Sequence, residues 1–265
     1  MKISLVLTTY EQPVSLAKAL ASIAAQTRRP DEVAVADDGS GPETARVVAE
    51  FAAAFPGPVH HVRQERDGYR KTRIFNQALA RTSGEYVVFL DGDSVPHLRF
   101  IEDHESLAEP GVWVQGRRAF VKERYVPGFR PTLPCVLAYA LTGRMTGLAK
   151  AFRLPVARVK RSRELRGILG CNLGIWRADL DVLNGYDEAY VEFGREDSDL
   201  GARLFHLGRD RKNVHGRAVL YHMNHPIYPR DGTPANDARL AETLRTKRIA
   251  CARGLKDWLK PEASA

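Results

Sequence analysis

Short apolar runs alternate with longer segments of helical spacing over residues 1–90. The apolar runs predict strands and the segments between them predict helices, two of which begin with a proline, Pro13 and Pro42. Strands that alternate with helices of this length imply right-handed crossovers and a mainly parallel sheet. We therefore expect an α/β fold, a Rossmann-like sheet with helices on both faces, whose first elements lie at residues 3–9, 13–26, 32–40, 42–55, 59–64, 72–84 and 85–90.

The pattern changes in the second half of the chain. Residues 112–121 are typical of sheet, whereas residues 127–166 are basic, rich in proline and only weakly periodic. Further on, the sequence predicts an amphipathic helix at 195–208, a strand at 218–222 and a terminal helix at 236–259.

Polar clusters follow three of the predicted strands. They are "TTYE" at residues 8–11, "DDGS" at 37–40 and "DGD" at 91–93. In open parallel sheets, ligands bind at the carboxyl ends of the strands. The three clusters together therefore predict a ligand site at this edge of the sheet.

Asp91 and Asp93 come directly after the apolar strand "EYVVFL". On an extended segment, residues two apart point the same way, and Gly92 between them leaves room for a ligand. Two carboxylates so close together suit Mg²⁺ or Mn²⁺ bound with substrate phosphates. An ordinary turn is the alternative interpretation of "DGD".

Acidic residues also crowd the start of the helix predicted at 195–208, namely Glu196, Asp197 and Asp199. Carboxylates in a first helical turn are often caps and partners of the helix dipole. A carboxylate held there stays ionised, however, and can act as a general base towards a hydroxyl.

Two histidines, His222 and His225, follow the strand predicted at 218–222. A lone histidine is more often structural than a ligand. If one of them joins the carboxylates at a divalent cation, its nitrogen shifts the preference from Mg²⁺ towards Mn²⁺.

Three basic residues, Arg70, Lys71 and Arg73, open the helix predicted at 72–84. Phosphates bind readily at the positive end of a helix, where arginine offers paired donors. A solvated basic turn explains the same residues without a ligand.

The composition resembles that of soluble globular proteins, with 44% hydrophobic and 27% charged residues. No apolar run approaches the roughly 20 residues that a spanning helix needs, and the N-terminus lacks the long apolar region of a signal peptide. The cysteines, Cys135, Cys171 and Cys251, form no disulfide or metal pattern. We expect a cytoplasmic location.

A net charge of +8 suits an anionic partner. The excess is concentrated at residues 144–166, which carry eight Lys and Arg side chains and one acid, Glu164. These residues predict either peripheral contact with anionic lipid or contact with a phosphorylated acceptor, and a basic solvated loop is the alternative. Pro155 interrupts the segment, which argues against one long amphipathic helix.

The ordered motifs "TTYE", "DDGS", "GYRKTRIFNQAL", "YVVFLDGDSVP", "FGREDSDLGARL" and "YHMNH" resemble inverting family 2 glycosyltransferases of the GT-A fold. The second half, with "GCNLGIWRADLDVLNGYDEAY", is similar to a galactosyltransferase-type C-terminal region. The resemblance spans residues 1–226. It implies a nucleotide-sugar-binding half at 1–115, an acceptor-binding and catalytic half at 116–235, and a C-terminal helix and tail at 236–265.

The resemblance also implies which residues bind the donor, usually a UDP-sugar in this family. The "TTYE" segment would surround the nucleoside through Thr8, Tyr10 and Glu11. Either Asp37 or Asp38 would contact the uracil, and the sequence does not choose between them.

At the diphosphate, the resemblance implies a site for Mn²⁺ or Mg²⁺. Asp91 would lie beside the ribose and metal, with Gly92 next to it, and Asp93 would be the more direct ligand. His222 would complete the metal site, with His225 as the alternative ligand.

For the transfer itself, the resemblance makes Asp197 the catalytic base and places Glu196 against sugar or acceptor hydroxyls. Many family members have an arginine directly before the asparagine that matches Asn76, and here Phe75 stands there. We therefore expect the phosphate contacts to come from Arg70 or Arg73.

The sequence thus predicts a metal-dependent inverting enzyme that transfers a sugar to a hydroxyl of a bacterial surface glycan or a lipid-linked acceptor such as lipopolysaccharide core. No Gln-x-x-Arg-Trp motif of processive synthases occurs, which favours single additions. A nucleotidyltransferase is an alternative, but it usually has a glycine-rich loop where "TTYEQPVSLAKAL" stands. A nucleic-acid-binding protein is less favoured, because the basic residues are not interleaved with aromatic ones.

Overall fold

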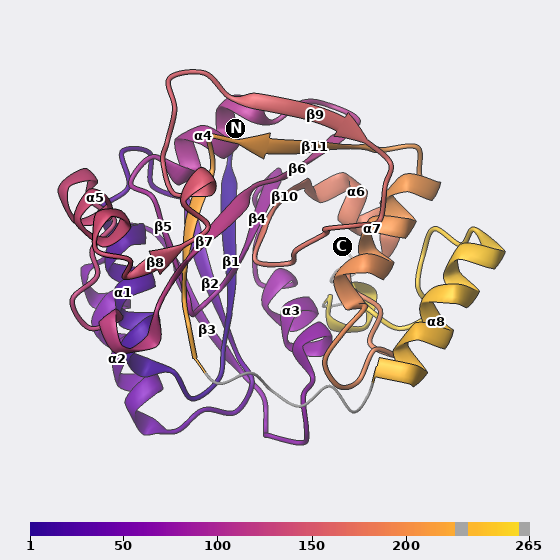
Figure 1. Ribbon diagram of the computed structural model, residues 1–265. Coiled ribbons are helices and arrows are strands. Elements are labelled where there is room, and N and C mark those ends of the chain that lie inside the picture. Colours follow the sequence, from indigo (N-terminus) through magenta and orange to yellow (C-terminus); the bar gives the residue numbers. More distant parts are fainter. Residues whose placement is uncertain (226–232, 260–265) are drawn as a thin grey trace.

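The computed structural model describes residues 1–225 and 233–259, so that the expected tail at 260–265 lies outside the described residues. An eight-stranded sheet with the strand order β3-β2-β1-β4-β10-β6-β11-β9 forms the centre of the molecule (Figure 1). Four of its neighbouring strand pairs are parallel and three are antiparallel. The predicted α/β fold with a mainly parallel sheet is confirmed.

The first half of the sheet follows the predicted order of strands and helices. Its strands lie parallel, and the central ones are buried because helices cover both faces. The elements are β1 (Ile3–Thr9), α1 (Pro13–Ala24), β2 (Glu32–Asp37), α2 (Pro42–Ala54), β3 (Val59–Arg63), α3 (Lys71–Leu79) and β4 (Tyr86–Asp91).

The other half of the sheet is built from distant segments of the chain. β10 (Asn172–Trp176) runs antiparallel between β4 and β6 (Val112–Gln115). β11 (Asp210–His215) is parallel to β6, and β9 (Arg158–Ser162) forms the far edge. Because β10 runs antiparallel to β4, the segment that precedes β10 reaches the edge where β4 ends.

A second, four-stranded sheet packs beside the first, in the order β5-β12-β7-β8. Its strands are β5 (Ser94–Pro96), β12 (Val219–Met223), β7 (Arg117–Val121) and β8 (Met145–Thr146). The segment predicted as sheet at 112–121 therefore divides at Gly116 between the two sheets. In the smaller sheet β12 pairs with β5, which places His222 opposite Ser94.

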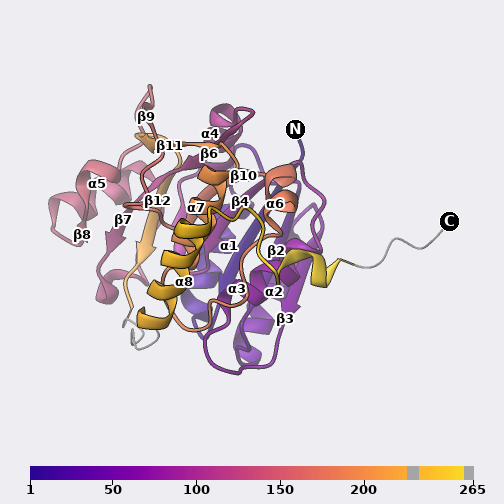
Figure 2. The same cartoon turned by 90° about the vertical axis from the view of Figure 1, so that its right-hand side faces the viewer.

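Apolar side chains fill both faces of the main sheet. One core lies against α1, α2 and α4 (Phe100–Leu107). The other lies against α3, α6 (Arg177–Leu183) and α7 (Glu196–His206), so that different helices cover the two faces (Figure 2). A smaller core joins the second sheet to α5 (Leu133–Leu141).

The stretch at 127–166 contains more regular structure than its weak periodicity indicated. Besides α5, β8 and β9 it holds the short 3₁₀ helix η2 (Leu148–Lys150), and η1 (Glu123–Tyr125) precedes it. The sequence of α5 shows no clear alternation of apolar and polar faces, because leucines also occupy its exposed face. Within the described residues, no helix combines the length and the hydropathy needed to span a bilayer.

The helix predicted at 236–259 is wrong in extent. α8 (Thr233–Thr246) ends before Lys247, which adopts a left-handed conformation with φ of 52°. The chain then turns back, and the Cys251 amide donates to the Leu183 carbonyl at 3.2 Å. Leu255, in η3 (Leu255–Trp258), enters the second core. Contacts with α6 and the segment after it therefore end the helix earlier than the spacing of apolar residues predicts.

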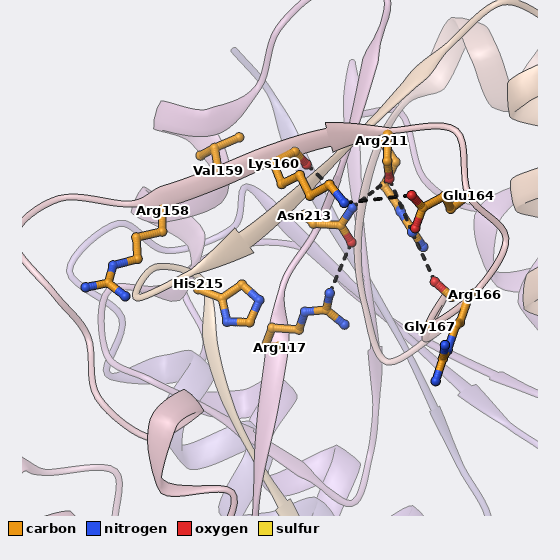
Figure 3. A pocket seen from close by; sticks show the side chains of 11 residues that line it. Arg117, Arg158, Val159, Lys160, Glu164, Arg166, Gly167, Arg211, Asn213 and His215 are labelled. Atoms are coloured by element: carbon orange, nitrogen blue, oxygen red, sulfur yellow. Dashed lines mark hydrogen bonds and ion pairs between the residues drawn. The ribbon is translucent and has the colours of Figure 1, made fainter.

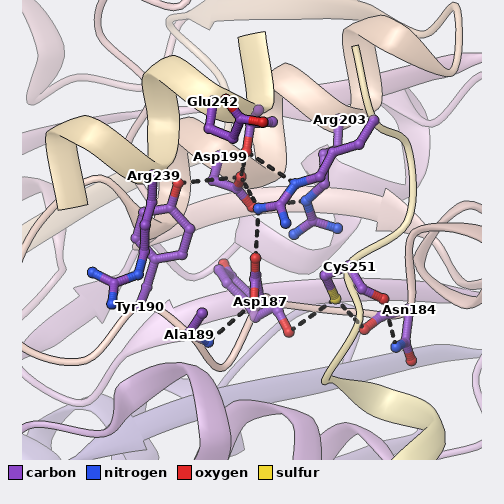
Figure 4. Close-up of polar contacts among 12 residues, drawn as sticks. Asn184, Asp187, Ala189, Tyr190, Asp199, Arg203, Arg239, Glu242 and Cys251 are labelled. Atoms are coloured by element: carbon purple, nitrogen blue, oxygen red, sulfur yellow. Dashed lines mark hydrogen bonds and ion pairs between the residues drawn. The ribbon is translucent and has the colours of Figure 1, made fainter. Parts of the chain in front are cut away.

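A buried polar cluster fastens α8 to α7 (Figure 4). The Asp199 carboxylate accepts hydrogen bonds from Arg203 Nε at 2.7 Å, Thr243 Oγ1 at 2.7 Å and Arg248 Nη2 at 3.1 Å. The Tyr190 hydroxyl donates to it at 3.3 Å. Since Asp199 belongs to the first turn of α7, this cluster fixes the turn that carries Glu196 and Asp197.

Candidate active site

The end of β4 packs closely against the end of β1. The Gly92 amide donates to the Thr8 carbonyl at 2.6 Å, and a Cβ at Gly92 would lie 2.7 Å from that oxygen. Only glycine fits this approach without moving the backbone. Asp91 precedes this glycine, and its Oδ1 lies 3.3 Å from Thr8 Oγ1 and 2.8 Å from Lys71 Nζ.

Asp93 lies in a different environment from Asp91. One carboxylate oxygen is 3.0 Å from His222 Nδ1, and the other is 3.0 Å from His225 Nε2. Burial opposes ionisation of Asp93, but hydrogen bonds from the two imidazoles outweigh it and hold its pKa well below the ordinary value. Pairing of β12 with β5 brings these residues together from positions about 130 apart in the chain, as hydrogen-bonded sheet strands do.

The cluster of Asp93, His222 and His225 fits a divalent cation. One potential ligand atom from each residue lies within 4.8 Å of the others. One carboxylate oxygen and two imidazole nitrogens suit Mn²⁺ better than Mg²⁺. The structure brings both candidate histidines to Asp93, whereas Asp91 faces Lys71 instead of joining this cluster.

A second acidic pair opens α7. The Asp197 carboxylate accepts a hydrogen bond from the Gly170 amide at 2.8 Å, and the Tyr186 hydroxyl lies 3.5 Å from its other oxygen. Glu196 is buried and accepts from the Gly194 amide at 3.0 Å, whereas Asp197 is half-buried. The approach at Gly170 is so close that a Cβ there would collide with the Asp197 carboxylate.

Burial shapes the proton affinity of this pair. It raises the pKa of Glu196 to about 7, with a further contribution from the neighbouring Asp197 charge. Burial also raises the pKa of Asp197, which the Asp91 carboxylate increases and Lys71 opposes. A carboxylate with a raised pKa is a better proton acceptor than an ordinary one.

Lys71 links the acidic groups; the sequence marks it as one of three basic candidates for phosphate, but the phosphate contacts are expected from Arg70 or Arg73. Burial opposes its charge, but Asp91 and the α7 carboxylates outweigh burial and raise its pKa well above the ordinary value. Its position at the start of α3, beside Arg70 and Arg73, was visible in the sequence. What the sequence did not reveal is which of these three side chains turns towards the acids.

Arg118, on β7, is a residue that the sequence did not indicate. Burial opposes its charge, but Cys171, Asp91 and Asp93 raise its pKa. Its Nη1 lies 3.3 Å from Cys171 Sγ. No local pattern distinguishes it from neighbouring arginines, because only the pairing of β7 with β12 directs it to the site.

Arg70 and Arg73, predicted to contact phosphate, direct their side chains to other partners, although the Arg70 amide donates to Asp38 at 3.4 Å. Arg70 forms an ion pair with Asp67, and the Arg73 guanidinium lies over the Trp258 ring at 5.3 Å. Neither is among the main charges that shift the pKa of Asp93, Glu196 or Asp197.

The residues predicted around the nucleoside gather where β1 and β2 end. Glu11 accepts from the Gly41 amide at 2.6 Å, and the Arg66 guanidinium lies 3.9 Å from the centre of the Tyr10 ring. Arg66 also pairs with Asp38. Arg66 therefore contacts both the Tyr10 ring and the Asp38 carboxylate.

Asp37 and Asp38 differ in their partners. Asp37 is fully buried, and its oxygens contact the Ser40 amide at 2.8 Å and His61 Nε2 at 3.0 Å. The first contact lies within the turn after β2, and the second joins that turn to β3. Gln64 Nε2 donates to Asp38 at 2.6 Å, and burial raises the pKa of Asp38.

The profile of glycosyl transferase family 2 matches residues 4–159. The chain belongs to this family. A second profile, described as the N-terminal domain of galactosyltransferase, matches residues 150–226, in agreement with the expected C-terminal region. The family match favours a glycosyltransferase over the two alternatives considered from the sequence.

Curated relatives include the chondroitin synthase of Escherichia coli, 26% identical over 242 residues that cover 84% of this chain and 35% of the relative. The hyaluronan synthase of Pasteurella multocida is 24% identical over 84% of this chain and 25% of the relative. The uncharacterized glycosyltransferase YfnE of Bacillus subtilis is 26% identical over 85% of this chain and 66% of the relative. The chain thus spans about a third and a quarter of the two synthases.

Solved structures share the fold. S. aureus TarS has a TM-score of 0.65 at 15% identity, over 97% of this chain and 68% of the TarS chain. PcManGT, a mannosyltransferase from Pyrobaculum calidifontis in complex with GDP-Man and Mn²⁺, has a TM-score of 0.59 at 20% identity, over 92% of this chain and 64% of the other. The expected GT-A fold is confirmed.

Proposed function

We propose that this glycosyltransferase is a metal-dependent, inverting enzyme that uses a nucleotide-sugar, with a UDP-sugar as the expected donor. The observation that supports it most is the separation of the acids into two environments. Asp93 lies between two imidazoles, whereas Asp197 lies with Lys71 and the Gly170 amide. One group suits a cation, and the other can accept a proton.

The donor would bind where β1, β2 and β4 end. Thr8, Tyr10 and Glu11 would surround the nucleoside, with Asp91 beside the ribose. Asp38 is the better candidate for the base than Asp37, because its partner Arg66 also contacts the Tyr10 ring, whereas Asp37 is fully buried and bound by Ser40 and His61. TarS has been solved in complex with UDP and with UDP-GlcNAc, which supports the choice of donor class.

Asp93, His222 and His225 would hold a divalent cation, with Mn²⁺ favoured over Mg²⁺ by their donor set. When bound, such an ion supplies Lewis-acid stabilisation of the charge that develops on the departing diphosphate. Lys71 and Arg118 would add positive charge beside Asp91, where they are already held.

In the transfer step, Asp197 would accept the proton of an acceptor hydroxyl as that oxygen attacks the anomeric carbon. A new carbon–oxygen bond forms while the bond from that carbon to the diphosphate breaks. The nucleoside diphosphate leaves with the electron pair, and one displacement inverts the anomeric configuration. No covalent sugar–enzyme intermediate is required.

Asp197 suits the role of base better than Glu196. Both carboxylates have a raised pKa, but Glu196 is only 4% exposed and is bound by the Gly194 amide. Asp197 is half-buried, so that an acceptor hydroxyl can reach it. Glu196 would contact hydroxyls of the sugar or acceptor from the inner side of the pair.

The acceptor in this proposal is a hydroxyl of a bacterial surface glycan or a lipid-linked saccharide such as lipopolysaccharide core. Each productive binding event would add one sugar. The curated relatives include synthases of polysaccharides, which supports a glycan acceptor without naming it for this chain.

Peripheral contact of the enzyme with an anionic membrane at the cytoplasmic face is a further part of the proposal. Several basic residues of 144–166 are neutralised internally, such as Arg153 by buried Asp103 and Arg163 by Asp210. The exposed face of α5 supports the contact better, because Leu133, Leu137 and Leu141 are 63%, 43% and 85% exposed. Flotation with anionic liposomes tests it, and no dependence on anionic lipid would contradict it.

A nucleotide-release screen tests the proposed reaction. Purified protein is incubated with a panel of nucleotide-sugars and glycan acceptors in Mn²⁺, in Mg²⁺ or in EDTA. We expect release with at least one UDP-sugar, loss of release in EDTA, and an inverted anomeric centre in the product by NMR. Release that persists in EDTA, or a product with retained configuration, would contradict the proposal.

A further inference from the structure

A cavity of about 430 Å³ lies at the edge of the main sheet formed by β9 and β11 (Figure 3). Five arginine and lysine side chains line it, accompanied by a single acid, Glu164. None of the four carboxylates of the candidate active site is among its lining residues. The cavity is therefore a separate site, and its charge is strongly positive.

Strand pairing explains how the cationic side chains come to face one another. β9 and β11 pair with Arg158 opposite His215, Lys160 opposite Asn213, and Ser162 opposite Arg211. Alternate residues of a strand lie on the same face, so that these six side chains share one face of the sheet. The intervening residues Arg161 and Lys212 face the other side, where both pair with Glu109.

Arg211 forms the floor of this cavity. The residue is 2% exposed and has no ion pair with any described residue, and its Nε and Nη1 have no hydrogen-bond partner there. Its Nη2 donates only to neutral oxygens, those of Ser162 at 3.4 Å and Arg166 at 3.1 Å. A buried guanidinium without a counter-charge is costly unless a ligand supplies one.

Arg117 increases the positive charge around Arg211. Its Nε also lacks a partner among the described residues, and its Nη2 donates to Asn213 at 3.3 Å. Burial and the Arg117 charge lower the pKa of Arg211, and the Glu164 charge opposes this shift only in part. Burial and the charges of Arg117, Lys150 and Arg158 likewise lower the pKa of His215. Glu164, the one acid among the lining residues, lies 3.7 Å from Lys160 Nζ and offsets only part of this repulsion.

We propose that this cavity binds a phosphate ester, specifically a phosphorylated sugar residue. Two arginines at the floor offer forked donors that match phosphate oxygens, and Arg158, Lys160 and Arg166 surround the opening. A doubly charged anion balances several cations better than one carboxylate does. The volume exceeds that of a single phosphate group and leaves space for the attached sugar.

The cavity is connected to the catalytic acids by a short stretch of chain. Gly167 lines it, and Gly170, which donates to Asp197, follows three residues later. Three residues span at most about 11 Å, so that a ligand at Gly167 lies within reach of the acceptor side of the site. The neighbouring residues Arg117 and Arg118 on β7 likewise serve the cavity and the active site respectively.

The phosphate ester therefore belongs to the acceptor, and this assignment rests on the proposed glycosyl transfer. The existence of the anion-binding site does not depend on that proposed reaction. Binding is measured without donor or metal, by calorimetry and by NMR titration of the His215 ring. The ligands are a hexose 1-phosphate, inorganic phosphate and the uncharged hexose.

The test variant is the double substitution R158Q/K160Q, which removes two exposed charges from the rim. The matched control is R161Q, which removes the same type of charge from the same strand but on the opposite face. We expect the hexose phosphate to bind, to raise the His215 pKa, and to bind about tenfold or more weakly to the double variant, because charge-assisted hydrogen bonds are lost. Binding to R161Q should stay within about twofold, as for a rim charge outside the site.

Equal weakening in R161Q, or no binding of hexose phosphate to the unmodified protein, would overturn the site. Inorganic phosphate that binds as tightly as the hexose phosphate would overturn the assignment to an acceptor sugar. If transfer to glycans is also observed, the hexose phosphate should inhibit it competitively against acceptor in the unmodified enzyme and less in R158Q/K160Q. Binding without any transfer would refute the proposed function and leave the anion site standing.

Discussion

Asp91 and Asp93 are separated by one residue but have unlike neighbours. Lys71 and Thr8 hold Asp91, whereas two imidazoles hold Asp93. The pair at the start of α7 differs again, because burial raises the pKa of both Glu196 and Asp197. At the scale of single residues, the environment and not the residue type assigns each carboxylate its proposed task.

Lys71 is expected to set the acid limb of the pH profile. It lowers the pKa of both Glu196 and Asp197, so that its removal should raise their pKa and shift this limb to higher pH. For K71M we expect kcat/KM to fall about tenfold more near pH 6 than near pH 9. The matched control is R73M on the same helix, since Arg73 lies over Trp258 and away from the acids. A K71M profile with an unmoved acid limb would contradict this role.

At the scale of elements, the site depends on how strands and helices from distant segments meet. β12 brings the histidines to Asp93, and β10 brings the preceding Gly170 to Asp197. The first turn of α7 is held in turn by the buried cluster around Asp199. The buried contacts of Asp199 thus hold the helical turn that carries Glu196 and Asp197.

Asp199 should be a main contributor to stability. It is fully buried and has arginine partners on α7 and in the segment after α8. We expect D199N to lower the free energy of unfolding by about 3–5 kcal/mol, because it leaves buried arginine charge uncompensated. Burial opposes the charge of Asp199, but Arg203 and its other partners lower its pKa, so its contribution is present at neutral pH and lost only as pH falls through the lowered value.

Denaturant unfolding at neutral pH measures this effect. The control is E242Q on α8, because Glu242 pairs with Arg245 at the exposed surface and should contribute far less to stability. An equal loss of stability in the two variants would refute the role of the buried cluster.

At the scale of the whole molecule, the sequence predicted the first half of the fold well. Periodicity and the proline starts located β1 to β4 and their helices, and the polar strand ends predicted the edge of the sheet that holds the candidate site. It failed where long-range pairing decides the structure. The insertion of β10 between β4 and β6, the turn of Arg118 into the site and the end of α8 before Lys247 depend on contacts with distant residues.

The same dependence separates the basic residues at the start of α3, for which the phosphate contacts of Arg70 and Arg73 stay a prediction. Arg70, Lys71 and Arg73 have similar local sequence signals for phosphate binding, but Asp67 engages Arg70 and Trp258 engages Arg73. Trp258 lies more than a hundred residues along the chain from both, at the C-terminal 3₁₀ helix. Sequence spacing alone contains no information on that contact.

The active-site carboxylates should lower the stability of the whole molecule at neutral and alkaline pH. Glu196 has a pKa of about 7 in the folded protein, above its ordinary 4.5, so that folding favours its protonated form. Stability from this group is therefore complete below about pH 4.5 and is lost as pH rises through 7. For E196Q we expect the free energy of unfolding to rise by about 1–3 kcal/mol at pH 8 and to change little at pH 4.

Unfolding of E196Q at these two pH values tests the prediction, with E50Q as a control because Glu50 is exposed on α2. A stabilisation of E196Q that is the same at both pH values would contradict it.

The most direct test of the account is a paired measurement of nucleotide binding and turnover in D197N and D93A. The division of tasks predicts that D197N binds the nucleotide in Mn²⁺ as the unmodified enzyme does, yet loses turnover by about 10²–10⁴-fold, the range of general-base catalysis. D93A should lose turnover and also bind the nucleotide more weakly in Mn²⁺, with no such difference in EDTA. A fully active D197N enzyme would contradict the central claim that Asp197 accepts the proton.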